Sequence, residues 1–360
     1  MTSIPPDPLP TIPFKLTRAG VVMTPQEGNE FEAEGVLNPA SGRGPDGELY
    51  LLPRLVAKGN VSRVGLAKVI IDGGVPCGVE RQGVVLGPDE GWERGLHNAG
   101  TEDPRTTWVP SLGKHLMTYV AYGPLGPRLA FAHSEDLRHW ERLGRAFFEY
   151  QAELSMDLNL FPNKDAVFFP EPVNDPDGVS SYAMLHRPMW DLDWILEGEG
   201  EYLPAGLTDN RPGIWISYVA VADVAKDLKN LVHMGKHKLV ALSEFPFEET
   251  KIGSGPPPIR VDEGWLLIHH GVTGALEKSA SHLQQKVNYV AAAMILDAED
   301  PSRVIARSDV PLLTPETKDE ISGIVPNVVF PTAIEEIDGQ LFVFYGMADC
   351  RIGVAKLDRI

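Results

Sequence analysis

The chain has 360 residues, of which 43% are hydrophobic and 23% are charged, and these values are typical of a soluble globular protein. Fifty acidic residues against 32 basic ones give a formal net charge of −18, which argues against nucleic acid or an anionic membrane as a partner. The two cysteines, Cys77 and Cys350, lie far apart and form no CxxC or Cys/His cluster, so the sequence predicts no structural zinc site.

The N-terminal residues 1–30 begin with a proline-rich stretch and lack the periodicity of a strand. We expect an extended arm here, followed by a single domain over residues 31–360. The start of the chain has neither the basic nor the apolar region of a signal peptide. Apolar runs such as Tyr289–Leu296 are too short to span a bilayer. These features predict a cytoplasmic protein with no membrane-spanning segment.

Five pairs of apolar runs follow in chain order. In each pair, an apolar strand ends in polar or aromatic residues, and a loop leads to a second strand rich in Ala, Val and Ile. The pairs are 49–54 with 63–67, 116–122 with 129–132, 182–187 with 214–217, 265–270 with 289–293, and 341–346 with 352–355. Because long helical periods are scarce, this pattern predicts an all-β protein. The repetition favours a five-bladed β-propeller, and a pair of β-sandwiches is the competing architecture.

The largest insertion between these runs covers residues 190–212 and is rich in Asp, Glu and Gly. It is equally consistent with a rim loop or lid and with a solvated loop that only decorates the surface.

Several strands of this pattern lead into charged or imidazole groups. Arg54, Arg187 and His270 end three of the apolar runs, and Asp349 follows the fifth. A charge in such a position is costly unless it is paired or solvated. In a propeller, strands from different blades converge on one axis, so these four residues predict a shared pocket.

The stretch Gly100–Arg105 concentrates further charge. Asp103 directly precedes Pro104, which biases its backbone toward an extended or turn conformation. Its carboxylate is therefore presented rather than packed, with Arg105 close enough to orient it. On its own, the stretch is also consistent with an ordinary surface turn.

The loop 251–258 combines a lysine with glycines and a run of prolines. Glycine permits close approach of the backbone to a ligand, and the prolines stiffen the loop. A stiff connector with a solvated lysine is the alternative, and the loop does not fit a Walker A motif.

Six segments, taken in order, resemble the motif series of glycoside hydrolase family 130. They are 98–105, 164–171, 185–188, 251–258, 264–271 and 325–331, and the resemblance extends roughly from residue 31 to the C-terminus. It implies a five-bladed propeller as the catalytic domain, acting on β-mannosides, in most branches of the family by inverting phosphorolysis.

The resemblance also implies roles for single residues. Asp103 matches the catalytic acid, which in this family acts through a hydroxyl of the mannosyl ring. The matches to the phosphate-binding set are Lys164, Arg187, Lys251 and His270, and those around the sugar next to the scissile bond are Asn38, Arg54, Arg63 and Asp349. Lys164 stands where many members carry arginine, which keeps the charge but loses the planar fork. No metal or cofactor is implied, because inorganic phosphate is the co-substrate.

The leading hypothesis is therefore a phosphorylase that converts a terminal β-mannoside and phosphate into α-mannose 1-phosphate and an acceptor sugar. Mannosyl-glucose, mannosyl-N-acetylglucosamine and manno-oligosaccharides are the candidate substrates. An inverting hydrolase needs a second carboxylate as base, whereas a phosphorylase needs a cationic cradle for the anion. Two alternatives stay open: a β-mannoside hydrolase of the same fold, favoured by the acidic run 197–201, and a non-catalytic carbohydrate-binding propeller. Family members often form homo-oligomers, so a homo-oligomer is one option for this chain.

Overall fold

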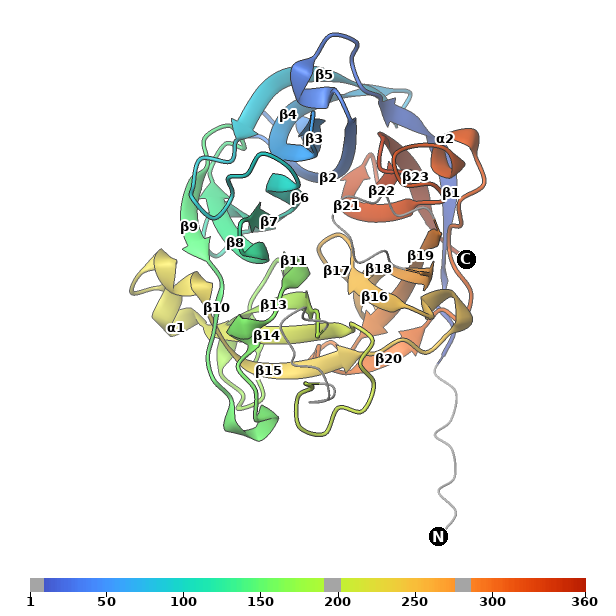
Figure 1. Ribbon diagram of the computed structural model, residues 1–360. Coiled ribbons are helices and arrows are strands. Elements are labelled where there is room, and N and C mark those ends of the chain that lie inside the picture. Colours follow the sequence, from blue (N-terminus) through green and yellow to red (C-terminus); the bar gives the residue numbers. More distant parts are fainter. Residues whose placement is uncertain (1–9, 191–201, 276–285) are drawn as a thin grey trace.

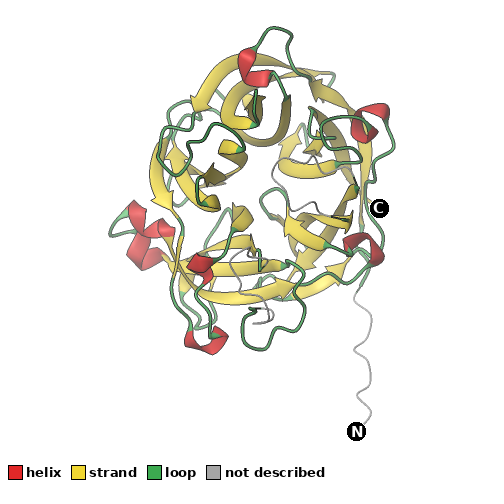
Figure 2. Ribbon diagram, viewed as in Figure 1, coloured by secondary structure: helices red, strands yellow, loops and turns green. Residues whose placement is uncertain are grey.

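The computed structural model describes residues 10–190, 202–275 and 286–360. Its strands form four hydrogen-bonded sheets arranged around a common centre (Figure 1). The helical segments of the described residues are at most five residues long, and Figure 2 shows most of them at the periphery of the molecule. The expectation of an all-β protein is confirmed.

The first sheet, in spatial order, contains β1 (Phe14–Met23), β23 (Arg351–Arg359), β22 (Gln340–Met347) and β21 (Val329–Ile337). An eight-stranded sheet contains β2 (Gly35–Arg43), β3 (Leu49–Ala57), β4 (Val61–Asp72), β5 (Val75–Leu86), β6 (Ala99–Val109), β7 (Lys114–Gly123), β8 (Gly126–Ser134) and β9 (Glu141–Arg145). Its two halves are joined only by a short parallel pairing of β4 with β6.

The third sheet contains β10 (Phe147–Phe148), β15 (His233–Ala241), β14 (Ile214–Ala220), β13 (Ser180–Pro188), β12 (Val173–Asn174) and β11 (Asn163–Phe168). The fourth contains β16 (Lys251–Ser254), β17 (Ile259–Val261), β18 (Gly264–Gly274), β19 (Val287–Leu296) and β20 (Val304–Arg307). The α-helical turns are α1 (Val221–Val224) and α2 (Lys318–Ile321), and the 3₁₀ turns are Glu30–Glu32, Ala152–Leu154, Leu158–Leu160, Leu228–Val232 and Pro246–Glu248.

All five expected strand pairs form antiparallel ladders, namely β3 with β4, β7 with β8, β13 with β14, β18 with β19, and β22 with β23. In each case a further strand lies nearer the centre than the pair (Figure 1). We call these the inner strands; they are β2, β6, β11, the segment β16–β17, and β21. Arg54, Arg187 and His270 therefore reach the centre from second strands, not from innermost ones.

The N-terminal residues differ from the extended arm that we expected over residues 1–30. From Phe14 to Met23 they form β1, which pairs antiparallel with the last strand of the chain, β23. The reason is local, because Phe14 and Leu16 are buried while Lys15 and Thr17 are exposed, as in a half-buried strand. Eleven of the 23 residues of the insertion 190–212, for which a rim loop or lid and a solvated loop stayed open, are residues 191–201, outside the described residues.

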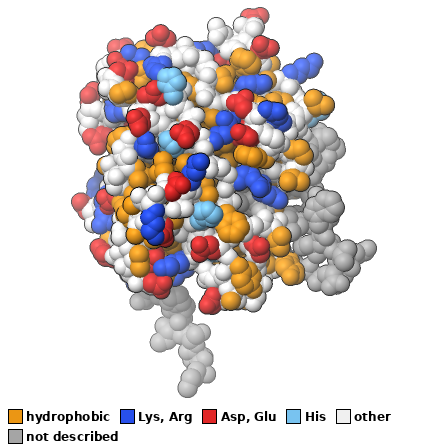
Figure 3. Space-filling model, turned by 90° about the vertical axis from the view of Figure 1, so that its left-hand side faces the viewer, with side chains coloured by type: hydrophobic (Ala, Val, Ile, Leu, Met, Phe, Trp, Pro, Cys, Tyr) orange, Lys and Arg blue, Asp and Glu red, His pale blue; other side chains and the backbone are white. Residues whose placement is uncertain are grey.

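The hydrophobic core is divided among the interfaces between neighbouring sheets. One cluster joins β18–β20 to β1 and β21–β23, and another joins β13–β15 to β18 and β19. A third packs β7 and β8 against β11 and β13–β15. Each large apolar side chain buried in this way contributes about 1.5–3 kcal/mol. The outer surface is mixed in charge: on the face drawn in Figure 3, Lys and Arg are interspersed with Asp and Glu. No helix of the described residues is long and apolar enough to cross a membrane.

Candidate functional site

Three inner strands carry the same irregularity near the centre of the ring. Their ladders shift register between Leu37 and Ala40, between Glu102 and Arg105, and between Lys164 and Val167. Within these bulges, Asn38, Asp103 and Asp165 adopt φ values of 42°, 46° and 55°. Asn and Asp tolerate this left-handed region better than other side-chain-bearing residues. A bulge re-aims a side chain, and here each one presents a polar group.

Asp103 lies at the junction of three strands. Its Oδ1 accepts a hydrogen bond from Nδ2 of Asn38 over 2.8 Å and another from Nη1 of Arg54 over 3.0 Å. Arg54 also donates from Nη2 to Oε1 of Glu102 over 2.8 Å. The second oxygen of Glu102, Oε2, lies 3.6 Å from Nζ of Lys164. An alternating chain of charges therefore links Asp103 to Lys164.

Asp165 organises the second half of the site. Its Oδ2 accepts a hydrogen bond from Nε of Arg187 over 2.6 Å and lies 3.5 Å from Nε2 of His270. The fit is close, because a Cβ at Gly253 would lie only 2.3 Å from this oxygen. Glycine is thus required where β16 passes this carboxylate.

Two guanidinium nitrogens in this region, Nη1 of Arg187 and Nη2 of Arg105, are buried without a hydrogen-bond partner among the described residues. The same holds for both ring nitrogens of His270. Buried donors are normally satisfied, since leaving one unpaired is costly. The unpaired groups therefore point to an anionic ligand.

Lys251 completes the cationic cluster from β16. Its Nζ lies 5.4 Å from the centre of the Tyr289 ring. Burial lowers the pKa of Lys251 to about 7, with Arg187 and Lys164 adding to the effect and Asp165 opposing it. The pKa of His270 is held well below its ordinary value by burial, and Arg187 and Lys251 reinforce this. The four residues matched to phosphate binding thus lie close enough to act on one another's ionisation.

The pKa values of the two carboxyl groups matched to the reaction centre are shifted in opposite directions. Burial opposes the ionisation of Asp103, but Arg54, Lys164 and Arg105 outweigh it and lower the pKa. Burial raises the pKa of Asp349 to about 6, and the neighbouring Asp103 contributes to the rise. In the ligand-free protein Asp349 is therefore the more easily protonated of the pair.

Arg63 takes no part in these hydrogen bonds and ion pairs, and its Nη1 is buried without a hydrogen-bond partner among the described residues. Its guanidinium lies 4.8 Å from the centre of the Phe31 ring, and no hydrogen bond among the described residues joins it to Asp103. Arg105 donates its hydrogen bonds to backbone carbonyls and not to a carboxylate. It donates from Nε to the carbonyl of Gly255 over 2.9 Å and from Nη1 to the carbonyl of Asp103 over 3.1 Å.

Sequence reasoning missed the bridging roles of Glu102 and Asp165 and the position of Tyr289. Asp165 follows Lys164 directly in a segment already singled out, so its charge was a usable signal. Tyr289 begins an apolar strand and carried no such signal. Among the described residues, no group of three or more His, Cys, Asp and Glu side chains is arranged to hold a metal ion.

Comparison with known proteins gives consistent matches. A family model described as beta-1,4-mannooligosaccharide phosphorylase matches residues 56–360. The 1,2-beta-oligomannan phosphorylase of Thermoanaerobacter sp. (strain X514) is 32% identical over 94% of this chain and 94% of its own length. A beta-1,2-mannobiose phosphorylase from the same organism is 30% identical over 76% of this chain and 69% of its own. Among solved structures, the beta-1,2-mannobiose phosphorylase of Listeria innocua, in complex with beta-1,2-mannobiose, shares the fold with a TM-score of 0.67, at 21% identity over 96% of both chains.

Proposed function

The chain belongs to glycoside hydrolase family 130, and on that premise we propose that it cleaves a terminal β-mannoside with inorganic phosphate. The products are α-mannose 1-phosphate and an acceptor sugar. The observation that carries the proposal is the cluster of Lys164, Arg187, Lys251 and His270, whose buried nitrogens include unpaired donors. The curated relatives named as phosphorylases of β-mannosides support the same reaction. We also infer that the sheets form five blades, because the eight-stranded sheet divides at its short β4–β6 link.

In the proposed site, the phosphate dianion lies among the four basic side chains. Arg187 uses Nε to hold Asp165, which leaves its Nη1 to donate to a phosphate oxygen. Lys164 and Lys251 act as point charges on either side. Asp165 orients Arg187, so the geometry of the cradle exists before the anion arrives.

The reaction is then a single inverting displacement. A phosphate oxygen attacks the anomeric carbon of the mannosyl unit while the bond from that carbon to the acceptor oxygen breaks. Asp103 supplies the proton for the departing oxygen through a hydroxyl of the mannosyl ring. Asn38, Arg54 and Asp349 surround that ring, and Arg63 lies at its margin.

Asp103 must carry a proton to act in this way, yet its cationic neighbours lower its pKa in the free protein. A phosphate dianion bound beside Lys164 offsets part of that positive charge. By the same electrostatic rule the pKa of Asp103 rises when phosphate binds. Phosphate thus serves both as nucleophile and as the group that prepares the acid.

Hydrolysis by the same fold is the second candidate. Asp349, with its pKa of about 6 and its place beside Asp103, is the carboxyl group best suited to act as the base for water. However, water is a neutral nucleophile and does not require a cluster of basic groups to bind it. The acidic run 197–201 lies outside the described residues and adds nothing to either side.

The test is to incubate the protein with β-1,2-mannobiose, β-1,4-mannobiose, mannosyl-glucose and mannosyl-N-acetylglucosamine, each with and without phosphate. We expect α-mannose 1-phosphate from at least one substrate, and only when phosphate is present. EDTA should leave the rate unchanged, because side chains and phosphate supply all the charges of the proposed mechanism. Release of free mannose at a rate indifferent to phosphate would establish the hydrolase instead.

A further inference from the structure

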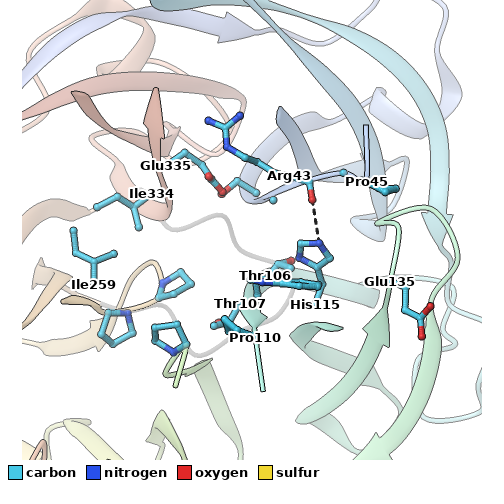
Figure 4. A pocket seen from close by; sticks show the side chains of 17 residues that line it. Arg43, Pro45, Thr106, Thr107, Pro110, His115, Glu135, Ile259, Ile334 and Glu335 are labelled. Carbon is cyan, nitrogen blue, oxygen red and sulfur yellow. Dashed lines mark hydrogen bonds between the residues drawn. The ribbon is translucent and has the colours of Figure 1, made fainter. Parts of the chain in front are cut away.

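A second place of interest is a cavity of about 650 Å³, whose lining residues Figure 4 shows. The inner strands contribute to both places. Along β2 and β6, Asn38 and Asp103 belong to the candidate site, whereas Ser41 and Thr106, three residues further on, line the cavity. Further lining comes from Pro170 after β11, Ile259 in β17 and Glu335 in β21. At about 3.3 Å per residue, the residues of each pair on β2 and β6 are about 10 Å apart along the strand.

Flat apolar groups form much of the cavity wall. Pro257, Pro258, Ile259 and Ile334 lie on one side, and Figure 4 shows both isoleucines across from Thr106 and His115. Trp108 adds an aromatic surface. Its side chain is 45% exposed, and its ring centre lies 4.7 Å from that of His115. Surfaces of this kind accept the apolar face of a ring.

Apart from Arg43, the polar side chains of the cavity offer acceptors or hydroxyls. Nε2 of His115 lies 3.1 Å from the carbonyl of Arg43, so this nitrogen carries the hydrogen and Nδ1 is left as an acceptor. Burial lowers the pKa of His115 to about 4, which keeps the ring neutral. Nδ1 of His115 and Oγ1 of Thr106 are both buried without a hydrogen-bond partner among the described residues.

Glu335 is one of the two acidic residues of this wall; the other, Glu135, is paired with Lys114. Oε1 of Glu335 accepts a hydrogen bond from Oγ of Ser41 over 2.7 Å, and among the described residues Glu335 has no ion pair. Burial raises its pKa, so the site is better suited to hydrogen-bond donors than to further negative charge. Arg43, the basic residue of the wall, already donates to the carbonyls of Gly47 and Glu336. The two carboxyl groups of the wall, Glu335 and Glu135, outnumber its one guanidinium, so a further anion is disfavoured.

We propose that this cavity is a second ligand site, separate from the candidate active site, and that it binds a neutral hydroxylated ring, that is, a sugar unit. The apolar face of the sugar packs on Trp108 and the prolines. Its hydroxyl groups pair with Glu335, Thr106 and Nδ1 of His115. A purely apolar ligand would leave these polar groups unpaired, and an anionic ligand would be repelled.

The indole resonance of Trp108 in a ¹H–¹⁵N spectrum provides a direct test. The chain has seven tryptophans, and the resonance of Trp108 is the one missing from the spectrum of Trp108→Phe. Mannose, methyl β-mannoside and N-acetylglucosamine are added separately at millimolar concentrations, without phosphate. We expect a saturable shift of the Trp108 resonance with at least one of these sugars. Glu335→Gln should weaken that binding about tenfold, because a neutral amide oxygen replaces the charged acceptor.

Glu336→Gln is the matched control, because Glu336 is the next residue and its side chain is exposed. It should bind as the wild type does. The shift should also persist in Asp103→Asn, since the cavity is separate from the candidate active site. The proposal is overturned if the Trp108 resonance does not move, if the two glutamate variants behave alike, or if the shift disappears in Asp103→Asn. A shift caused by benzylamine but by none of the sugars would identify an organic-cation site and overturn it equally.

Discussion

Arg187→Lys tests the proposed cradle most directly, because the substitution keeps the charge and removes the fork. In the structure, Nε of Arg187 is engaged with Asp165 over 2.6 Å, while Nη1 is buried and unpaired. A lysine has a single nitrogen, so it either holds Asp165 or reaches the phosphate. The variant therefore loses one hydrogen bond to a charged group, about 1.5–3 kcal/mol. This corresponds to a rise of roughly 10- to 150-fold in KM for phosphate.

The assay measures formation of α-mannose 1-phosphate while phosphate is varied at saturating mannoside, and then the reverse. KM for the mannoside should change much less than KM for phosphate. Arg142→Lys is the matched control, since Arg142 is also paired with a carboxylate, that of Glu93, but lies in the outer strand β9. If Arg187→Lys raised only the KM for the mannoside, Arg187 would belong to the sugar site and the phosphate assignment would be wrong.

Three further outcomes are expected. Asp103→Asn should lower kcat by roughly 100- to 10,000-fold, as loss of a general acid does, while thermal unfolding confirms that the variant is folded. Because the pKa of Lys251 is lowered to about 7, its attraction for phosphate is lost as the pH rises through that value, so KM for phosphate should increase above about pH 7; a flat profile would contradict the role of Lys251. Gly346→Ala would place a Cβ 2.1 Å from Oδ1 of Asn38, so it should displace the Asn38 side chain from Asp103. Loss of this hydrogen bond should reduce kcat/KM for the mannoside about tenfold. Unchanged kinetics would show that the hydrogen bond is dispensable.

The strand pairs could be predicted from the sequence because their apolar residues recur without interruption. The inner strands escaped prediction for the opposite reason. Asn38 and Pro39 break β2, and Asp103 and Pro104 break β6, exactly where the bulges lie. The polar residues and prolines at these bulges supply the side chains of the site, and they also interrupt the apolar alternation by which a strand is recognised. In β1, the proline-rich stretch before the strand obscured the short alternation of apolar and polar residues that begins at Phe14.

The site was predictable where a segment of sequence carries its own charge pattern, as around Asp103 and Lys251. It was not predictable where the contact depends on the fold. Asn38, Arg54 and Asp103 come from different strands. Only the fold brings Nδ2 of Asn38 and Nη1 of Arg54 to within 3.0 Å of Oδ1 of Asp103. Arg63 was placed near the sugar by the family resemblance alone; in the fold its guanidinium lies 4.8 Å from the centre of the Phe31 ring, and its role stays a prediction.

The charge balance of the cluster explains why phosphate and a proton belong together in the proposed reaction. The ionisable groups, apart from His270, are Arg54, Arg105, Lys164, Arg187 and Lys251 against Glu102, Asp103, Asp165 and Asp349. Fully ionised, five cations and four anions leave one positive charge. If Lys251 is neutral and Asp349 protonated, four and three leave the same charge. A phosphate dianion turns this into one negative charge, and uptake of one proton restores neutrality. A buried site favours that neutral state, so binding of the nucleophile draws in the proton that the leaving group needs.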